Sequence, residues 1–92
     1  MITINEIVDM FSEFEPLAKP CPLCGKKPIF VYSDSCTHIS TIRLGHICAP
    51  RTTGAAIDKA VDLMQLSQYY NQKFFISCLL EEIVNEWNRS IS

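Results

Sequence analysis

Two cysteines near the start of the chain have the spacing of half a metal site. Cys21 and Cys24 are separated by Pro22 and Leu23 and are followed by Gly25. Two thiolates at this spacing can point toward one tetrahedral metal ion, and thiolate ligands are typical of zinc. Pro22 fixes one backbone φ, and Gly25 permits the positive φ that folds the chain back beneath the metal. The segment therefore predicts a zinc knuckle, which needs further ligands to close it.

A β-hairpin after the knuckle is expected to supply those ligands. Residues 29–32 and 41–44 are rich in β-branched and aromatic side chains, which favours two short strands. A hairpin folded about Thr37 sets residue 28 opposite His46, so the return strand carries His46 and Cys48 back to the knuckle. On a strand, residues 46 and 48 point to the same face. The two side chains can therefore bind the same ion.

We predict that the metal ligands are Cys21, Cys24, His46 and Cys48. Four protein ligands leave no open position for water or substrate, so the zinc site is expected to be structural. Cys36 and His38 fall at the far tip of the hairpin, about 25 Å from the knuckle at the rise of an extended strand. If the hairpin is shorter or bulged, Cys36 or His38 could replace His46.

Length and composition limit the class of protein. The 92 residues predict one domain, residues 1–92, whose small core would gain stability from a bound metal. Apolar residues are 48% of the chain, as in packed globular proteins, and five cysteines favour metal binding over a disulfide framework. The formal charge of −2 argues weakly against nucleic-acid binding by the whole surface. Without a membrane-length apolar run or a secretory leader, a cytoplasmic location is expected.

Two helices before the last one are expected to cover the core. The first spans residues 3–15, where Thr3 and Glu6 have capping-box spacing and Pro16 ends the helix. The second begins near Ala55, because the apolar residues after it recur at helical intervals. Those residues are Ile57, Ala60, Val61 and Met64. Together with the hairpin and the last helix, these two helices predict an α+β fold. It consists of a zinc-ribbon-like β-hairpin with a knuckle, packed by an N-terminal helix and two C-terminal helices.

The last helix is predicted over about residues 73–89, after residues 65–72, where the pattern does not decide between helix and break. Its apolar stripe comprises the i, i+4 row Phe75, Leu79, Ile83 and Trp87, widened by Phe74, Ile76, Cys78, Leu80 and Val84. The stripe is wider than one narrow core-facing side of a helix requires. Part of it is expected to pack on a second copy, forming a homodimer, or on a partner helix, unless the first two helices wrap around it. Cys78 is expected to be a small buried hydrophobe.

Two separated blocks of the chain resemble one protein family. They are Lys19-Pro20-Cys21-Pro22-Leu23-Cys24-Gly25 and Glu81-Glu82-Ile83-Val84-Asn85-Glu86-Trp87-Asn88-Arg89. In this order around a hairpin, they resemble the Lar-like restriction alleviation family, small zinc-ribbon-like proteins of phages and prophages. The chain departs from that family in two places: His46-Ile47-Cys48 stands where a second Cys-x-x-Cys pair is usual, and residues 49–72 lengthen the stretch before the final helix.

The resemblance implies a non-enzymatic protein that modulates a host defence system, as in relief of type I restriction, by binding a host protein complex. No catalytic residue carries over. The end of the second block also has a structural interpretation from its residues alone. Trp87, at the end of an apolar stripe, is typical of a side chain that plugs the core. Asn88 can help to finish the helix. The positive charge of Arg89 interacts favourably with the helix dipole in the last turn.

The basic residues support an alternative function. Lys19, Lys26, Lys27, Arg43 and Arg51 could gather around the metal end and form a local basic patch, with Tyr32 available for base stacking. This pattern indicates a nucleic-acid-binding zinc ribbon that acts in transcription or DNA processing.

Overall fold

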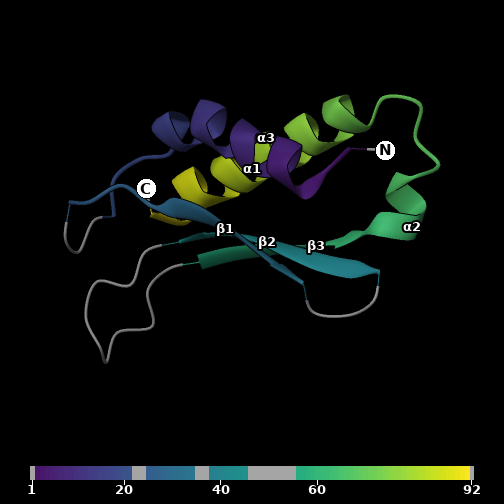
Figure 1. Ribbon diagram of the computed structural model, residues 1–92. Helices are drawn as coiled ribbons and strands as arrows, with labels where there is room; N and C mark the ends of the chain where they lie inside the picture. The colour runs from purple at the N-terminus through teal and green to yellow at the C-terminus, as the bar shows by residue number, and fades with distance from the viewer. Residues whose placement is uncertain (1, 22–24, 35–37, 46–55, 92) are drawn as a thin grey trace.

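The computed structural model describes residues 2–21, 25–34, 38–45 and 56–91. Its elements are α1 (Ile4–Phe14), the 3-10 turn η1 (Glu15–Leu17), β1 (Ile29–Asp34), β2 (Ile39–Gly45), β3 (Ala56–Asp62), α2 (Leu63–Leu66) and α3 (Gln72–Ile91). The strands form one antiparallel sheet in the order β1-β2-β3, and α1 and α3 lie on one face of it (Figure 1). The predicted α+β class is therefore confirmed, whereas one expected helix is a strand.

Helix α1 begins where the capping pattern predicts. The Thr3 Oγ1 accepts a hydrogen bond from the Glu6 backbone N–H at 3.1 Å, which satisfies one of the free donors of the first turn. Ile7 and Phe11 are buried against the sheet, and the Phe11 ring stacks on Phe30 with centroids 5.0 Å apart. The helix prediction for residues 3–15 is confirmed, since α1 runs from Ile4 to Phe14 between its caps Thr3 and Glu15.

The hairpin has the register predicted from its turn position. Ile29 pairs with Gly45 and Asp34 with Ser40, the same alignment that sets residue 28 opposite residue 46. Both strands are longer than predicted. Alternate residues of β2 point toward the helices, and Ile42 and Leu44 are fully buried there.

The prediction of a helix beginning near Ala55 is wrong. Residues Ala56–Asp62 form β3, which pairs antiparallel with β2 from Gly45↔Ala56 to Ile39↔Asp62. The inward face of β3 carries Ile57, Lys59 and Val61 in strict alternation. Lys59 interrupts the apolar pattern of that face. Its Nζ donates a hydrogen bond to Glu86 Oε1 of α3 at 3.0 Å, which gives the inward-facing ammonium a partner. The Glu86 hydrogen bond raises the pKa of Lys59, so the ammonium stays charged at this half-buried position.

A short helix and a turn connect the sheet to the last helix. The Asp62 carboxylate caps α2 by accepting hydrogen bonds from the backbone N–H groups of Met64 and Gln65 at 3.0 and 3.3 Å. Helix α2 ends at Leu66, and α3 begins at Gln72. The undecided segment 65–72 therefore contains the end of α2, a break at residues 67–71 and the first residue of α3.

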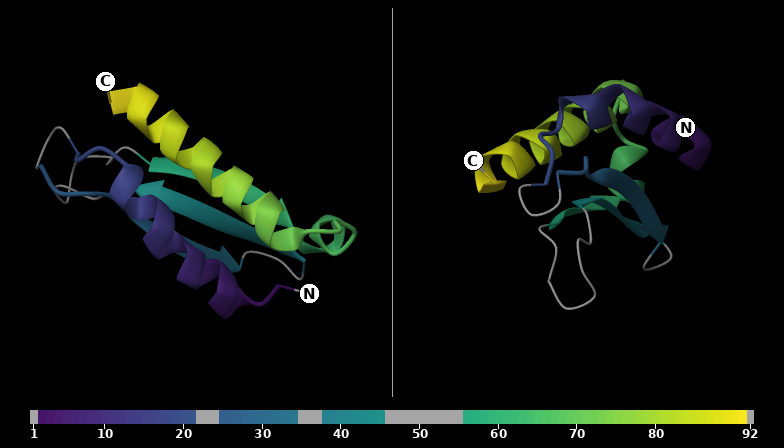
Figure 2. Two further views of the ribbon diagram at one scale, coloured as in Figure 1. Left: turned by 90° about the horizontal axis from the view of Figure 1, so that it is seen from above. Right: turned by 90° about the vertical axis from the view of Figure 1, so that its left-hand side faces the viewer.

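Helix α3 crosses the sheet beside α1, and the two helices begin at the same end of the molecule (Figure 2). The Ile2 backbone N–H donates to Gln72 Oε1 at 2.6 Å, which joins the two starts. The buried side chains of α3 are Ile76, Leu80, Ile83, Val84 and Trp87. No described helix is both long and apolar enough to cross a membrane.

The wide apolar stripe of α3 is only partly covered. Phe74 is 65% exposed, and Cys78 is also exposed, which overturns its prediction as a buried hydrophobe. The sheet and α1 cover the side that contains Ile76 and Leu80. Phe74 and Cys78 are each two positions from one of these residues, about 200° around the helix, so they face solvent.

Candidate functional site

Cys21 is the one predicted zinc ligand that the structure describes. Cys21 is 2% exposed and belongs to the hydrophobic core. Cys24, His46 and Cys48 lie outside the described residues, as does the alternative ligand Cys36. Within the described ranges, no three His, Cys, Asp or Glu side chains are placed to hold a metal ion. The four-ligand site therefore stays a prediction.

The chain around Cys21 folds back on itself as a knuckle requires. The Gly25 N–H donates to the Cys21 carbonyl at 2.7 Å, and the Cys21 N–H donates to the Lys26 carbonyl at 2.8 Å. Gly25 has a φ of 75°, which confirms the positive φ predicted for it. This closed turn fits the backbone of a thiolate knuckle, since it brings the residues before and after the second cysteine together.

We expect Gly25→Ala to destabilise the protein by about 1–2 kcal/mol, the conformational penalty of a left-handed residue that carries a Cβ. A Cβ at this position would meet no atom within 4 Å, so a steric clash adds nothing to that penalty. Urea denaturation followed by circular dichroism measures the change. Gly25→Asn is the control and should lose less, because asparagine tolerates this conformation better than alanine. Equal stability of wild type and Gly25→Ala would contradict the expectation.

His38 lies at the wrong end of the hairpin to replace His46. The β1–β2 pairing runs without interruption from Ile29↔Gly45 to Asp34↔Ser40. His38 follows that last pair, whereas the Cys21 turn leads into the opposite end of β1. His38 is exposed, and its carbonyl accepts a hydrogen bond from the Leu63 N–H at 2.7 Å. The bulged hairpin that would have favoured His38 is not observed in the described strands.

Consecutive residues of α3 hold the backbone that enters the turn. Trp87 Nε1 donates to the Lys19 carbonyl at 2.8 Å, while Asn88 Oδ1 accepts from the Lys19 N–H at 2.8 Å. Asn88 Nδ2 also donates to the Leu17 carbonyl at 3.2 Å. Trp87 is fully buried, which confirms its prediction as a core plug. Asn88 does not finish the helix as expected, because α3 continues to Ile91.

A second set of hydrogen bonds holds the backbone that leaves the turn. Glu15 Oε1 accepts from the Phe30 N–H of β1 at 3.1 Å, and Lys27 Nζ donates to the Pro16 carbonyl at 2.8 Å. Together with the contacts of Trp87 and Asn88, these bonds fix both ends of the segment in which the knuckle is predicted. No local sequence pattern predicts these contacts, because their partners lie between 11 and 71 residues apart.

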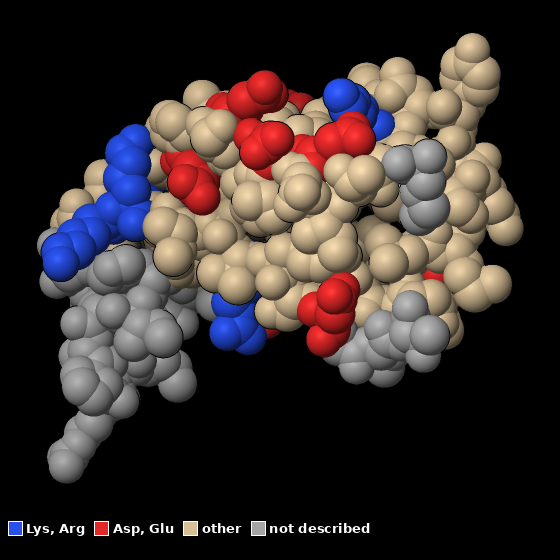
Figure 3. Space-filling view, in the orientation of Figure 1, with Lys and Arg blue, Asp and Glu red and all other residues tan. Residues whose placement is uncertain are grey.

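The basic residues named for nucleic-acid binding differ in their surroundings. Lys19, Lys26 and Lys27 are exposed, and Figure 3 shows basic side chains at the end of the molecule where the chain passes from η1 to β1. Arg43 is paired instead: its Nε lies 2.6 Å from Asp58 Oδ1, and this hydrogen bond raises the pKa of Arg43. Arg51 lies outside the described residues. The predicted patch is therefore reduced to the three lysines among the described residues.

Tyr32 is engaged inside the fold. Its hydroxyl donates to Ser40 Oγ at 2.6 Å, and Ser40 Oγ donates to Asp34 Oδ1 at 2.9 Å. Ser40 is fully buried, so this chain satisfies a polar group at the inner face of the sheet. Base stacking by Tyr32 would require the side chain to leave that network.

Comparison of the chain with known protein families, with curated proteins and with solved structures found no match.

Proposed function

We propose that the protein is a non-enzymatic, phage- or prophage-encoded interaction protein that modulates a host defence system. It acts in the host cytoplasm by binding a host protein complex, as in relief of restriction. The proposal starts from the resemblance of two sequence blocks to the Lar-like family, and it takes further support from the way those blocks meet in space.

The contact between the two blocks is the observation that carries the proposal. Lys19 belongs to the first block, and Trp87 and Asn88 belong to the second, 68 and 69 residues away. Both backbone groups of Lys19 are bonded by these two side chains. Contact between the two blocks is expected if they belong to one architecture, and it supports the resemblance on this ground.

Zinc would have a structural role in this protein. The closed turn at Cys21 fits a knuckle, and we propose that Cys21, Cys24, His46 and Cys48 hold the ion. Bound zinc would cross-link the start and the return of the hairpin and would supply folding energy rather than reactivity.

A surface for a protein partner lies on the helical side. The carboxylates of α1 and the exposed Phe74 of α3 share that side, and Figure 3 shows acidic side chains gathered over it. Exposed aromatic groups bordered by charges are typical of protein-binding surfaces.

A restriction assay tests the proposed function. A host with an active type I restriction system expresses the protein and is challenged with unmodified phage. We expect the plating efficiency to rise by at least about tenfold, and the tagged protein to copurify with subunits of the restriction enzyme. Lys59→Arg, which keeps the charge facing Glu86, serves as a folded control. Unchanged plating, together with no copurification from a strain that expresses the folded protein, would refute the proposal.

The three exposed lysines favour a second candidate, a nucleic-acid-binding zinc ribbon. A titration with duplex DNA at two salt concentrations separates the two functions. Salt-sensitive binding that is lost in a Lys26→Ala, Lys27→Ala variant would support the second candidate. Absence of binding at low salt would support the first.

A further inference from the structure

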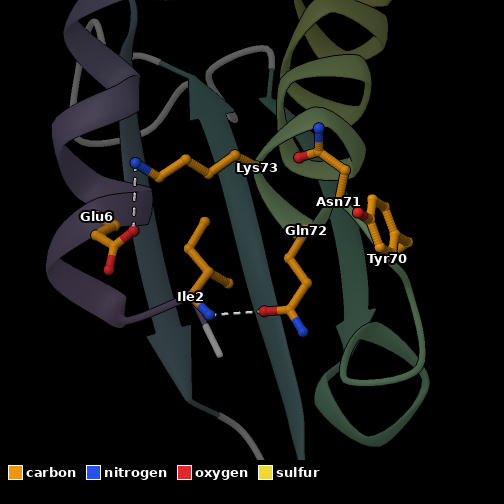
Figure 4. Close-up of a pocket in the computed structure, with 6 residues that line it drawn as sticks. All are labelled: Ile2, Glu6, Tyr70, Asn71, Gln72 and Lys73. Carbon is orange, nitrogen blue, oxygen red and sulfur yellow. Dashed lines mark hydrogen bonds and ion pairs between the residues drawn. The ribbon is translucent and has the colours of Figure 1, made fainter.

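A groove runs between α1 and the first half of α3 on the helical side of the molecule. It has a volume of about 580 Å³, and its lining comprises Glu6, Asp9, Met10, Glu13, Asn71, Lys73, Phe74 and Ser77. A smaller hollow of about 310 Å³ shares Glu6, Asn71 and Lys73 with it and extends to Ile2 and Tyr70 (Figure 4). The two hollows adjoin at these shared residues, along the line where the helices meet.

The charge of the groove is negative. Three carboxylates from α1 face one ammonium from α3, which leaves a net charge of −2 among the lining residues. Glu6, Asp9 and Glu13 have i, i+3, i+7 spacing, so they form one row about 10 Å long. Lys73 Nζ lies 3.5 Å from Glu6 Oε2 in an exposed pair, while Asp9 and Glu13 are exposed beyond it. A row of this kind complements positive charges on a partner.

Both helices contribute to the apolar part of the groove. Phe74 of α3 is 65% exposed, and the half-buried Met10 of α1 lines the same groove. Tyr70, which lines the adjoining smaller hollow, is fully exposed. Aromatic rings next to carboxylates suit lysine and arginine side chains, because the ring attracts the cation and the carboxylate pairs with it.

We infer that this groove is the docking site for a basic amphipathic helix of the partner protein. The inference rests on the proposed function and names the surface and the partner chemistry that the function would use. The apolar side of the incoming helix packs on Phe74 and Met10, and its lysines or arginines pair with Asp9 and Glu13. Two neighbouring helices that run in the same direction offer ridges and a groove that accept a third helix.

A synthetic helix of leucine and lysine, about 14 residues or four turns long, is the probe. Binding is measured by titration into the ¹⁵N-labelled protein, with the amide signals of the groove residues as readout. A peptide of the same composition without an apolar stripe is expected to bind more weakly. We expect the amphipathic peptide to shift the signals of Met10, Glu13, Phe74 and Ser77.

Two matched variants test whether the groove carboxylates matter. The first double variant, Asp9→Asn with Glu13→Gln, removes two negative charges from the groove lining. The second, Glu81→Gln with Glu82→Gln, removes two negative charges from α3 outside that lining. We expect the first variant to weaken peptide binding about three- to tenfold, and the second to change it less than about twofold. Equal weakening by both variants would indicate a diffuse charge effect and would overturn the inference.

Phe74→Ala tests the apolar part and is expected to weaken binding about tenfold. Its high exposure means that the fold should tolerate the change, which circular dichroism checks. Absence of peptide binding to the wild type would overturn the inference. So would concentration-dependent shifts of the groove signals without peptide, because they would identify a second copy of the chain as the occupant.

The restriction assay separates this inference from the proposed function. If relief of restriction is unaffected in the Asp9→Asn, Glu13→Gln variant and in Phe74→Ala, the function stands and the groove is not its docking site. If the wild type gives no relief but binds the peptide in the groove with the expected variant effects, the docking inference stands and the proposed function fails.

Discussion

Cys24→Ser is expected to unfold the protein or to lower its free energy of unfolding by several kcal/mol. Structural zinc contributes about 10–16 kcal/mol of binding free energy, which is as large as the whole stability of a small domain. Purified wild-type protein should contain about one zinc per chain. Elemental analysis measures the metal, and circular dichroism before and after treatment with a chelator measures the dependence of the fold on it.

Cys78→Ser is the matched control for this prediction, because Cys78 is an exposed thiol on α3. It should remain folded and keep its zinc. Cobalt substitution adds an independent readout, since thiolate ligands produce charge-transfer absorption that Cys24→Ser should reduce. Cys21→Ser is a less direct test, because Cys21 is also buried in the core. Metal-free wild-type protein that is fully folded would contradict the zinc prediction.

Trp87→Ala is expected to lower the free energy of unfolding by about 3–5 kcal/mol, the usual penalty for removing a buried aromatic side chain. Trp87 is completely buried, and the truncation would also leave the Lys19 carbonyl without its indole donor. This change approaches the full stability of many small domains. Urea denaturation followed by far-ultraviolet circular dichroism measures it, because the chain has one tryptophan and the variant loses that fluorescence.

Trp87→Phe separates the packing of this residue from its hydrogen bond. Phenylalanine keeps most of the apolar contact but cannot donate to Lys19, so we expect a smaller loss than for alanine. Asn88→Ala removes the neighbouring pair of hydrogen bonds and should destabilise by about 1–3 kcal/mol. A loss below about 0.5 kcal/mol for Trp87→Ala, as for an ordinary surface substitution, would contradict the structural role of this contact.

The hairpin and the two long helices were predictable because each depends on a local pattern. The position of the turn sets the register of an antiparallel hairpin, so the pairing that includes Ile29↔Gly45 followed from the sequence. Thr3 and Glu6 mark the start of α1 in the same local way. Gly25 adopts the positive φ that its place after Cys24 predicts.

Strand β3 could not be recognised in the same way. Ile57, Ala60 and Val61 have helical spacing by coincidence, and the charged Lys59 occupies a position where strand alternation calls for an apolar residue. The carboxylates of Glu86 and Glu82 on α3, 3.0 and 3.8 Å from the Lys59 Nζ, make that position acceptable for a lysine. Tertiary contacts of this kind override local propensity.

The candidate site was predicted in part. Sequence spacing predicted the positive φ of Gly25, which the structure confirms, and the zinc knuckle stays a prediction. The anchoring of Lys19 by Trp87 and Asn88 depends instead on contacts between the two ends of the chain. The exposure of Cys78 also followed from packing rather than pattern, because it depends on which side of α3 faces the sheet. A hydrophobic stripe predicts that a helix is partly buried, but it does not determine where burial stops.

The bond between Glu15 and Phe30 has a consequence for self-assembly. β1 is an edge strand, and its Phe30 N–H already donates to the Glu15 carboxylate. A strand from another molecule that joined this edge would have to displace that carboxylate and bring its own backbone against a negative charge. Amyloid-like growth and strand exchange through β1 are therefore disfavoured by one acidic side chain.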